Sequence, residues 1–172
     1  LAHLLLRVHA HVRGAMNVIG IDPGVTGAIA FYNGIDMAVR DLPAVKAAKA
    51  TSLDVTAVAR MLDGINETCA HAFIERVGAM PKQGVASSFN FGRSFGELHG
   101  LVAAQFVPIT LVPSPTWKKA LGVPREKDGA RLRASQLLPR ASGQWPLKKH
   151  DGRAEAALIA LYGWRQMFRE AA

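Results

Sequence analysis

The chain of 172 residues has few of the features that mark secreted or membrane proteins. It contains one cysteine, Cys69, so no disulfide can form within the chain, as is typical of proteins from a reducing compartment. No apolar run reaches the roughly 20 residues that a membrane-spanning helix needs, and we expect no membrane partner. Apolar residues make up 49% of the chain, which favours a folded core over disorder. These absences predict a folded cytoplasmic protein.

The length is that of one domain. Residues 1–15 precede Met16 and contain only a short apolar stretch, Leu4 to Leu6, which is too short for the core of a signal peptide. We expect them to be an N-terminal extension or a cloning remnant. The functional domain is expected to cover residues 16–172.

Acidic residues are scarce compared with basic ones. The chain has 21 Lys and Arg against 13 Asp and Glu, which gives a net charge of +8 and an isoelectric point near 10.2. Residues 118–153 alone contain ten basic and three acidic residues. A concentrated positive charge favours a polyanionic partner such as nucleic acid, because neutralised phosphates release their counterions. An ordinary basic surface is the alternative interpretation.

Hydrophobic patterning predicts strands followed by alternating helices and strands. Asn33-Gly34 is a strong hairpin signal between two of the strands, and residues 44–50 are expected to be an Ala- and Lys-rich linker. Residues 51–54 resemble a capping box before a helix. Strands are expected at residues 18–21, 27–32, 37–42, 72–77 and 109–112, and later helices from Ser87 or Ser88 to 105, from 126 to 138 and from 152 to 168. This order predicts an α/β fold with a mixed β-sheet flanked by helices.

Four acidic residues occupy positions where sites form. Asp22 ends the first strand, Glu75 lies inside an apolar strand, and Asp151 and Glu155 lie one turn apart at the start of the last helix. Carboxylates that converge in this way suit Mg²⁺, which prefers oxygen ligands, and paired metal ions hydrolyse phosphodiesters. Asp22 has a simpler alternative role in an Asp-Pro-Gly turn, and the helical acids have one as surface residues.

Three segments resemble the RuvC-like Holliday-junction resolvases of the ribonuclease H-like superfamily, especially the phage-type and mitochondrial members. They are residues 17–27 with Asp22, 73–76 with Glu75, and 150–160 with Asp151 and Glu155, and the resemblance extends over residues 16–164. It implies a ribonuclease H-like fold and a homodimer that nicks a four-way DNA junction, with Mg²⁺ as cofactor and Mn²⁺ as a substitute. A bacterial or phage-infected cell would be the setting.

The resemblance also suggests roles for basic and apolar residues. Lys118 and Lys127 fall where family members use a lysine near the scissile phosphate, although a solvated surface lysine is the alternative. Met80 is a candidate wedge into the junction, whereas Phe89 and Phe91 are expected in the helix core. The predicted nucleic-acid contacts are Arg76, Met80, Lys82, Arg93, Lys118, Lys119, Lys127 and Arg131.

The closing helix departs from the family pattern. Bacterial members have two acids, or a His and an Asp, three residues apart, whereas Asp151 and Glu155 are four apart. The longer Glu side chain also replaces the commoner Asp. His150 has two open interpretations, as a ligand or general base and as a solvated cap residue.

Other functions are compatible with parts of the pattern. Residues 22–27 also fit the Asp-x-Gly-x-Thr-Gly phosphate-binding strand of actin-like ATPases, but those proteins need two domains around a nucleotide. The chain has no Walker-type loop either. A nuclease for flaps, forks or RNA–DNA hybrids and a non-catalytic nucleic-acid-binding relative stay open, because loops and dimer geometry select the substrate.

Overall fold

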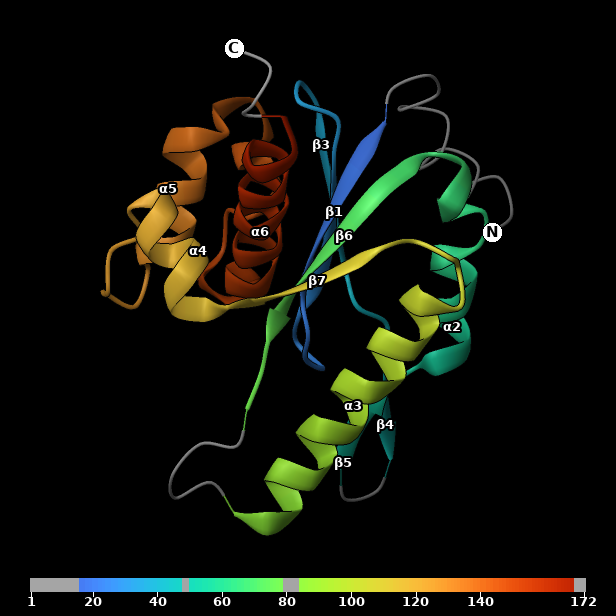
Figure 1. Cartoon of the computed structure of the whole chain (residues 1–172). Helices are drawn as coiled ribbons and strands as arrows, with labels where there is room; N and C mark the ends of the chain where they lie inside the picture. Colours follow the sequence, from blue (N-terminus) through green and yellow to red (C-terminus); the bar gives the residue numbers. More distant parts are fainter. Residues whose placement is uncertain (1–15, 48–49, 79–83, 169–172) are drawn as a thin grey trace.

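A computed structural model describes residues 16–47, 50–78 and 84–168 of the chain (Figure 1). Five strands form one sheet in the order β3-β2-β1-β6-β7. The antiparallel pairs β1–β2 and β2–β3 occupy one side of this sheet, and the parallel pairs β1–β6 and β6–β7 the other. The strands are β1 (Asn17–Asp22), β2 (Ala28–Tyr32), β3 (Met37–Asp41), β6 (Cys69–Arg76) and β7 (Ile109–Pro113). The mixed sheet confirms the predicted fold class.

The predicted hairpin at Asn33-Gly34 joins β2 to β3. Gly34 has a φ of 91°, a conformation that side-chain-bearing residues rarely adopt. The Asn33 side-chain oxygen accepts hydrogen bonds from the backbone amides of Ile35 (2.9 Å) and Asp36 (2.7 Å). The turn therefore sets the register in which Tyr32 pairs with Met37.

Residues 44–50 are not the linker that their composition predicts. β4 (Ala44–Ala47) pairs antiparallel with β5 (Ala50–Leu53) to make a separate two-stranded sheet. The predicted capping box at residues 51–54 is also wrong, because its first three residues belong to β5. Asp54 alone caps α2 (Val55–Leu62), and its carboxylate accepts a 2.9 Å hydrogen bond from the Ala57 amide. Alanine and lysine have low strand propensity, so this pairing depends on tertiary context.

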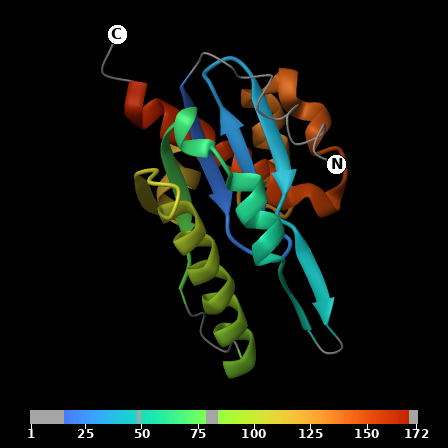
Figure 2. The ribbon, with the colours of Figure 1, turned by 90° about the vertical axis from the view of Figure 1, so that its right-hand side faces the viewer.

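Helices cover both faces of the sheet, and alternate residues of β1 separate the two layers. Val18 packs in a cluster with α4 (Ser114–Leu121), α5 (Gly129–Leu137) and α6 (Asp151–Phe168). Ile19 and Ile21 pack in a second cluster with α2 and α3 (Val85–Ala103). Figure 2 looks onto the face that α2 and α3 cover. The 3-10 turns are η1 (Ile65–Glu67), η2 (Pro139–Gln144) and η3 (Lys148–His150).

Some predicted helix limits and burials are wrong. α3 starts at Val85 after an extended Gly84 and has no serine cap, and it ends at Ala103 before Phe106, which has a positive φ of 58°. Phe89 is not a core residue, since 69% of it is exposed. α5 starts at Gly129, because residues 126–129 form a tight turn closed by an amide–carbonyl bond. No helix within the described ranges is both long and apolar enough to cross a lipid bilayer.

Candidate functional site

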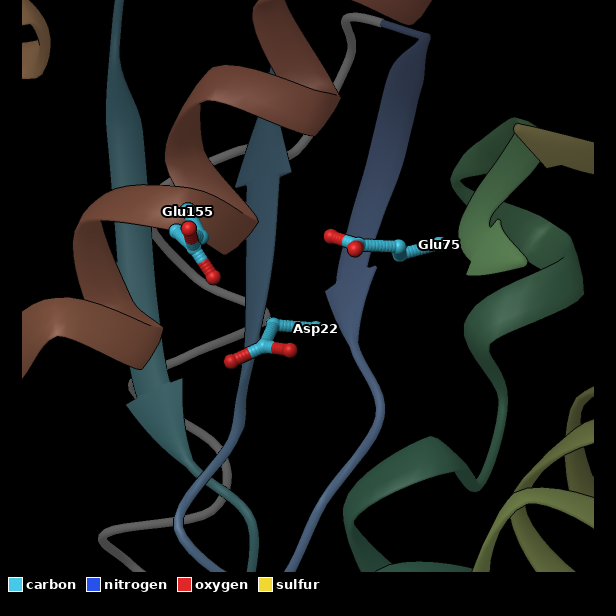
Figure 3. Close-up of side chains that lie close together, drawn as sticks. All are labelled: Asp22, Glu75 and Glu155. Carbon is cyan, nitrogen blue, oxygen red and sulfur yellow. The ribbon is translucent and has the colours of Figure 1, made fainter. Parts of the chain in front are cut away.

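Three carboxylates from distant parts of the chain meet at one edge of the sheet. Asp22 is the last residue of β1, Glu75 lies near the end of β6, and Glu155 lies in the second turn of α6. One carboxylate oxygen from each lies within 4.8 Å of the others, and Figure 3 shows the side chains directed toward one another. β1 and β6 run parallel with Ile21 opposite Ile74, so the following two acids leave the sheet side by side.

Helix α6 reaches this edge because it lies in backbone contact with β1. A Cβ atom at Gly20 would lie 2.2 Å from the Ala160 nitrogen and 2.3 Å from the Ala156 oxygen, so only glycine fits there. At the start of the helix, a Cβ atom at Gly152 would lie 2.9 Å from an Asp22 carboxylate oxygen. This close approach brings Glu155 to the end of β1.

The environment of Asp22 and Glu75 opposes their ionisation. Burial, followed by the charges of Glu155 and Glu75, raises the pKa of Asp22 to about 8. Burial and the charge of Glu155 also raise the pKa of Glu75, although hydrogen bonds from Ser114 and Trp117 and the charge of Lys118 oppose the shift. The three half-buried carboxylates repel one another, and the charge of Lys118 offsets this repulsion only in part. The donor set therefore fits a hard divalent cation, which would favour the ionised forms.

Two consecutive residues of α4 contact this cluster. The Trp117 indole nitrogen donates to a Glu75 carboxylate oxygen at 3.3 Å, and Lys118 Nζ lies 2.8 Å from Glu155 Oε1. Lys118 Nζ also lies 5.0 Å from the centre of the Trp117 ring. Although burial lowers the pKa of Lys118, the hydrogen bond and charge of Glu155 outweigh it and the pKa is raised. The sequence predicted Lys118 as a site residue but gave no sign of Trp117, which reads as an ordinary core residue.

Asp151 does not join the other three acids, so the four predicted ligands do not all converge. It lies in the first turn of α6, where its Oδ1 is 3.1 Å from Arg131 Nε of α5. The Arg131 guanidinium also pairs with Asp128 at 2.9 Å. His150 lies outside the cluster too, and its ring nitrogen accepts a 3.3 Å hydrogen bond from the Leu147 amide. A role for Asp151 in metal binding therefore stays a prediction.

A basic pocket adjoins the carboxylate cluster. Its volume is about 780 Å³, and Lys118 and Glu155 lie on its wall, so it borders the cluster directly. Three predicted nucleic-acid contacts, Lys118, Lys119 and Lys127, line it together with Arg125. α4 and the segment between α4 and α5 provide these four cations, and Glu126 is the other acid on the wall. The concentration of positive charge in the sequence thus corresponds in part to one surface.

The remaining predicted contacts lie elsewhere. Arg131 has a side chain that is only 17% exposed, and its ion pairs with Asp128 and Asp151 leave little of it for a phosphate. Arg76 is exposed at the end of β6, and Arg93 of α3 pairs with Glu97 at 3.5 Å. Met80 and Lys82 lie outside the described residues.

The structure resembles solved structures of Holliday-junction resolvases. One is a Thermus thermophilus RuvC in complex with a Holliday-junction substrate, with a TM-score of 0.60, 17% identity, and coverage of 91% of this chain and 96% of that one. A second Thermus thermophilus RuvC structure has a TM-score of 0.54 and 18% identity, and the match covers 91% of this chain and 96% of that one. The yeast mitochondrial Holliday-junction resolvase Ydc2 has a TM-score of 0.51 and 16% identity, and the match covers 98% of this chain and 87% of that one. No protein-family model matches the sequence, and no curated protein matches it as a relative.

The fold thus belongs to the ribonuclease H-like class of mixed sheets flanked by helices. Within that class the fold is similar to that of RuvC and Ydc2, as the resemblance of the three acidic segments predicted. Because the sequence identity is low, this conclusion applies to the fold and not to the activity.

Proposed function

We propose that the chain is a metal-dependent, structure-selective endonuclease that resolves four-way DNA junctions by paired nicks. The observation that carries the proposal is the convergence of Asp22, Glu75 and Glu155 beside a basic pocket. The fold adds support, because a structure with this fold is a RuvC in complex with a Holliday-junction substrate. We further propose that the protein acts as a cytoplasmic homodimer in which each subunit cuts one strand.

In the proposed mechanism, Asp22, Glu75 and Glu155 would hold Mg²⁺ or Mn²⁺. The bound cation would activate a water molecule and stabilise charge on the phosphoryl group and the leaving 3′-oxygen. Trp117 fixes the orientation of Glu75 through its indole hydrogen bond. Lys127, Lys119 and Arg125 attract the DNA backbone into the pocket. Hydrolysis adds the oxygen of water to phosphorus and releases a 3′-hydroxyl.

Asp151 has a separate place in the proposal. It lies one helical turn from Glu155, but Arg131 neutralises it at the start of α6. We assign it an outer role, in which its ion pair with Arg131 fixes α5 against α6. Its replacement is therefore expected to weaken catalysis much less than replacement of a clustered acid.

The test is cleavage of a synthetic four-way junction, a linear duplex and a flap in Mg²⁺. We expect symmetric paired nicks in the junction alone, and a loss of about 100-fold or more in Asp22→Asn and Glu155→Gln, since each removes a ligand. Asp151→Asn should lose about tenfold, as outer residues of metal sites do. Asp63→Asn is the matched control, because this exposed acid ends α2 on the opposite face of the sheet.

Other outcomes point to the alternative functions. Equal cutting of flaps or forks would indicate a nuclease for branched DNA in general. Tight junction binding without cleavage in Mg²⁺ or Mn²⁺ would indicate a non-catalytic relative. Activity that survives Asp22→Asn would contradict the proposed centre, because Asp22 is one of its three converging acids.

A further inference from the structure

The ammonium group of Lys118 lies where the carboxylate cluster needs a positive charge. Its 2.8 Å contact with Glu155 is the ion pair that the structure gives to the three clustered acids among the residues described. The Lys118 side chain is 37% exposed and Glu155 is 23% exposed, so the pair borders solvent on the pocket side. The cluster is thus neutralised in part by the chain itself.

We propose that Lys118 is a resident counter-ion that occupies Glu155 until a divalent cation displaces it into the basic pocket. The inference rests on the proposed metal centre and adds an exchange step to it. An ammonium group and a divalent cation repel each other, so both are not expected on the same carboxylate. In the proposed exchange, cation binding breaks the contact between Lys118 Nζ and Glu155 Oε1.

The surroundings of Lys118 provide a place for the displaced group. The residue lines the 780 Å³ pocket beside Lys119 and Lys127, and its flexible four-carbon side chain lets the ammonium move without a change in α4. α4 itself is held by the buried side chains of Trp117 and Leu121. The displaced ammonium group would then pair with a DNA phosphate in the pocket. Metal binding and DNA binding would then favour each other.

Lys119 offers a matched comparison. It follows Lys118 on the same helix and lines the same pocket, but it forms no ion pair within the described ranges. A lysine that affects the metal only through the general field of the basic surface should behave like Lys119. A lysine that competes for Glu155 should not.

The experiment measures Mn²⁺ binding to the full chain without DNA, from the electron paramagnetic resonance signal of free Mn²⁺. We expect Lys118→Met to bind Mn²⁺ about tenfold more tightly than the wild type. In the wild type without metal, Lys118 occupies Glu155 most of the time, and this competition lowers the apparent affinity for Mn²⁺. Lys118→Arg keeps the charge and should stay near the wild type, as should Lys119→Met. Without metal, Lys118→Met should melt at a lower temperature, and Mn²⁺ should raise its melting temperature more than that of the wild type.

Each other result overturns the inference. Unchanged Mn²⁺ affinity in Lys118→Met would show that the lysine does not compete, and weaker affinity would make it a positioning residue for Glu155. An equal gain in Mn²⁺ affinity in Lys119→Met would show that the effect comes from the overall positive charge of the basic pocket and not from competition for Glu155. If Lys118→Met does not fold, Lys118→Gln serves the same comparison. Absence of Mn²⁺ binding in the wild type would refute the metal centre as well, whereas wild-type binding without tightening refutes this inference alone.

Discussion

Helices α6 and α3 lie on opposite faces of the same sheet, but they are packed very differently. Eight of the 18 residues of α6 are buried, and five of these eight are alanine or glycine in the stretch that crosses the sheet. Only three of the 19 residues of α3 are buried, and its N-terminal half extends beyond the five-stranded sheet (Figure 1). α6 is therefore fixed at the level of its backbone, and α3 only along its C-terminal half.

The difference shows how the fold separates two tasks. A carboxylate that must meet two others within 4.8 Å needs a support that does not move, and α6 provides it through contact with β1 at Gly20. α3 carries no member of the cluster and exposes apolar side chains such as Val85 (87%) and Phe89 (69%). The small residues of α6 thus help to position the site, although none of them belongs to the carboxylate cluster.

The largest effect is expected from Gly20→Ala, which breaks the contact between α6 and β1. The new Cβ atom would lie 2.2 Å and 2.3 Å from backbone atoms of α6, which cannot rotate away. We expect a loss of about 3 kcal/mol in the free energy of unfolding, at the upper end for overpacked cores, measured by urea denaturation. Because α6 must move outward, Glu155 leaves Asp22, and nicking should fall further than the folded fraction.

The control for this prediction is measured at a temperature where the variant is fully folded by circular dichroism. Normal junction cleavage under that condition would show that the site tolerates movement of α6. It would then contradict the view that backbone contact positions the acids.

The sequence was sufficient for the parts of the fold that local rules determine. The Asn33-Gly34 turn and the strand at residues 18–21 depend on neighbouring residues only. The pairing of β4 with β5 was not accessible, since alanine- and lysine-rich segments form strands only where a partner strand is available. Local pattern therefore predicted the sheet but not its small appendage.

The site was predictable to a similar degree. Strand ends located Asp22 and Glu75, and helical spacing located Glu155. The same spacing put Asp151 on the face of Glu155, but its place in the first turn brings it next to Arg131 of α5, a neighbour that only the tertiary structure reveals. The contact of Trp117 with Glu75 depends in the same way on how α4 follows β7.

A second prediction compares two side chains of α3. Leu98 is fully buried against the α2 layer, so Leu98→Ala should cost about 2 to 4 kcal/mol through lost burial and a cavity. Phe89→Ala removes a larger side chain from the exposed half and should change stability by no more than about 0.5 kcal/mol. Thermal or urea unfolding of both variants checks this. A cost of more than 1 kcal/mol for Phe89→Ala would show that the projecting half of α3 packs against another surface.

The smallest expected effect comes from Gly96→Ala, the same substitution as at Gly20 but on α3. Apart from its chain neighbours and the adjacent backbone of α3, no atom of the described residues lies within 4 Å of the added Cβ, and the residue is in the middle of the helix. Alanine loses less backbone entropy than glycine on helix formation, so we expect a gain of about 0.5 to 1 kcal/mol in the free energy of unfolding, with junction cleavage unchanged. Urea denaturation of Gly20→Ala and Gly96→Ala side by side therefore measures the contrast between the helices with one chemical change. A loss of stability in Gly96→Ala would mean that another surface packs against α3 at Gly96. The contrast between a fixed helix α6 and a projecting helix α3 would then no longer hold.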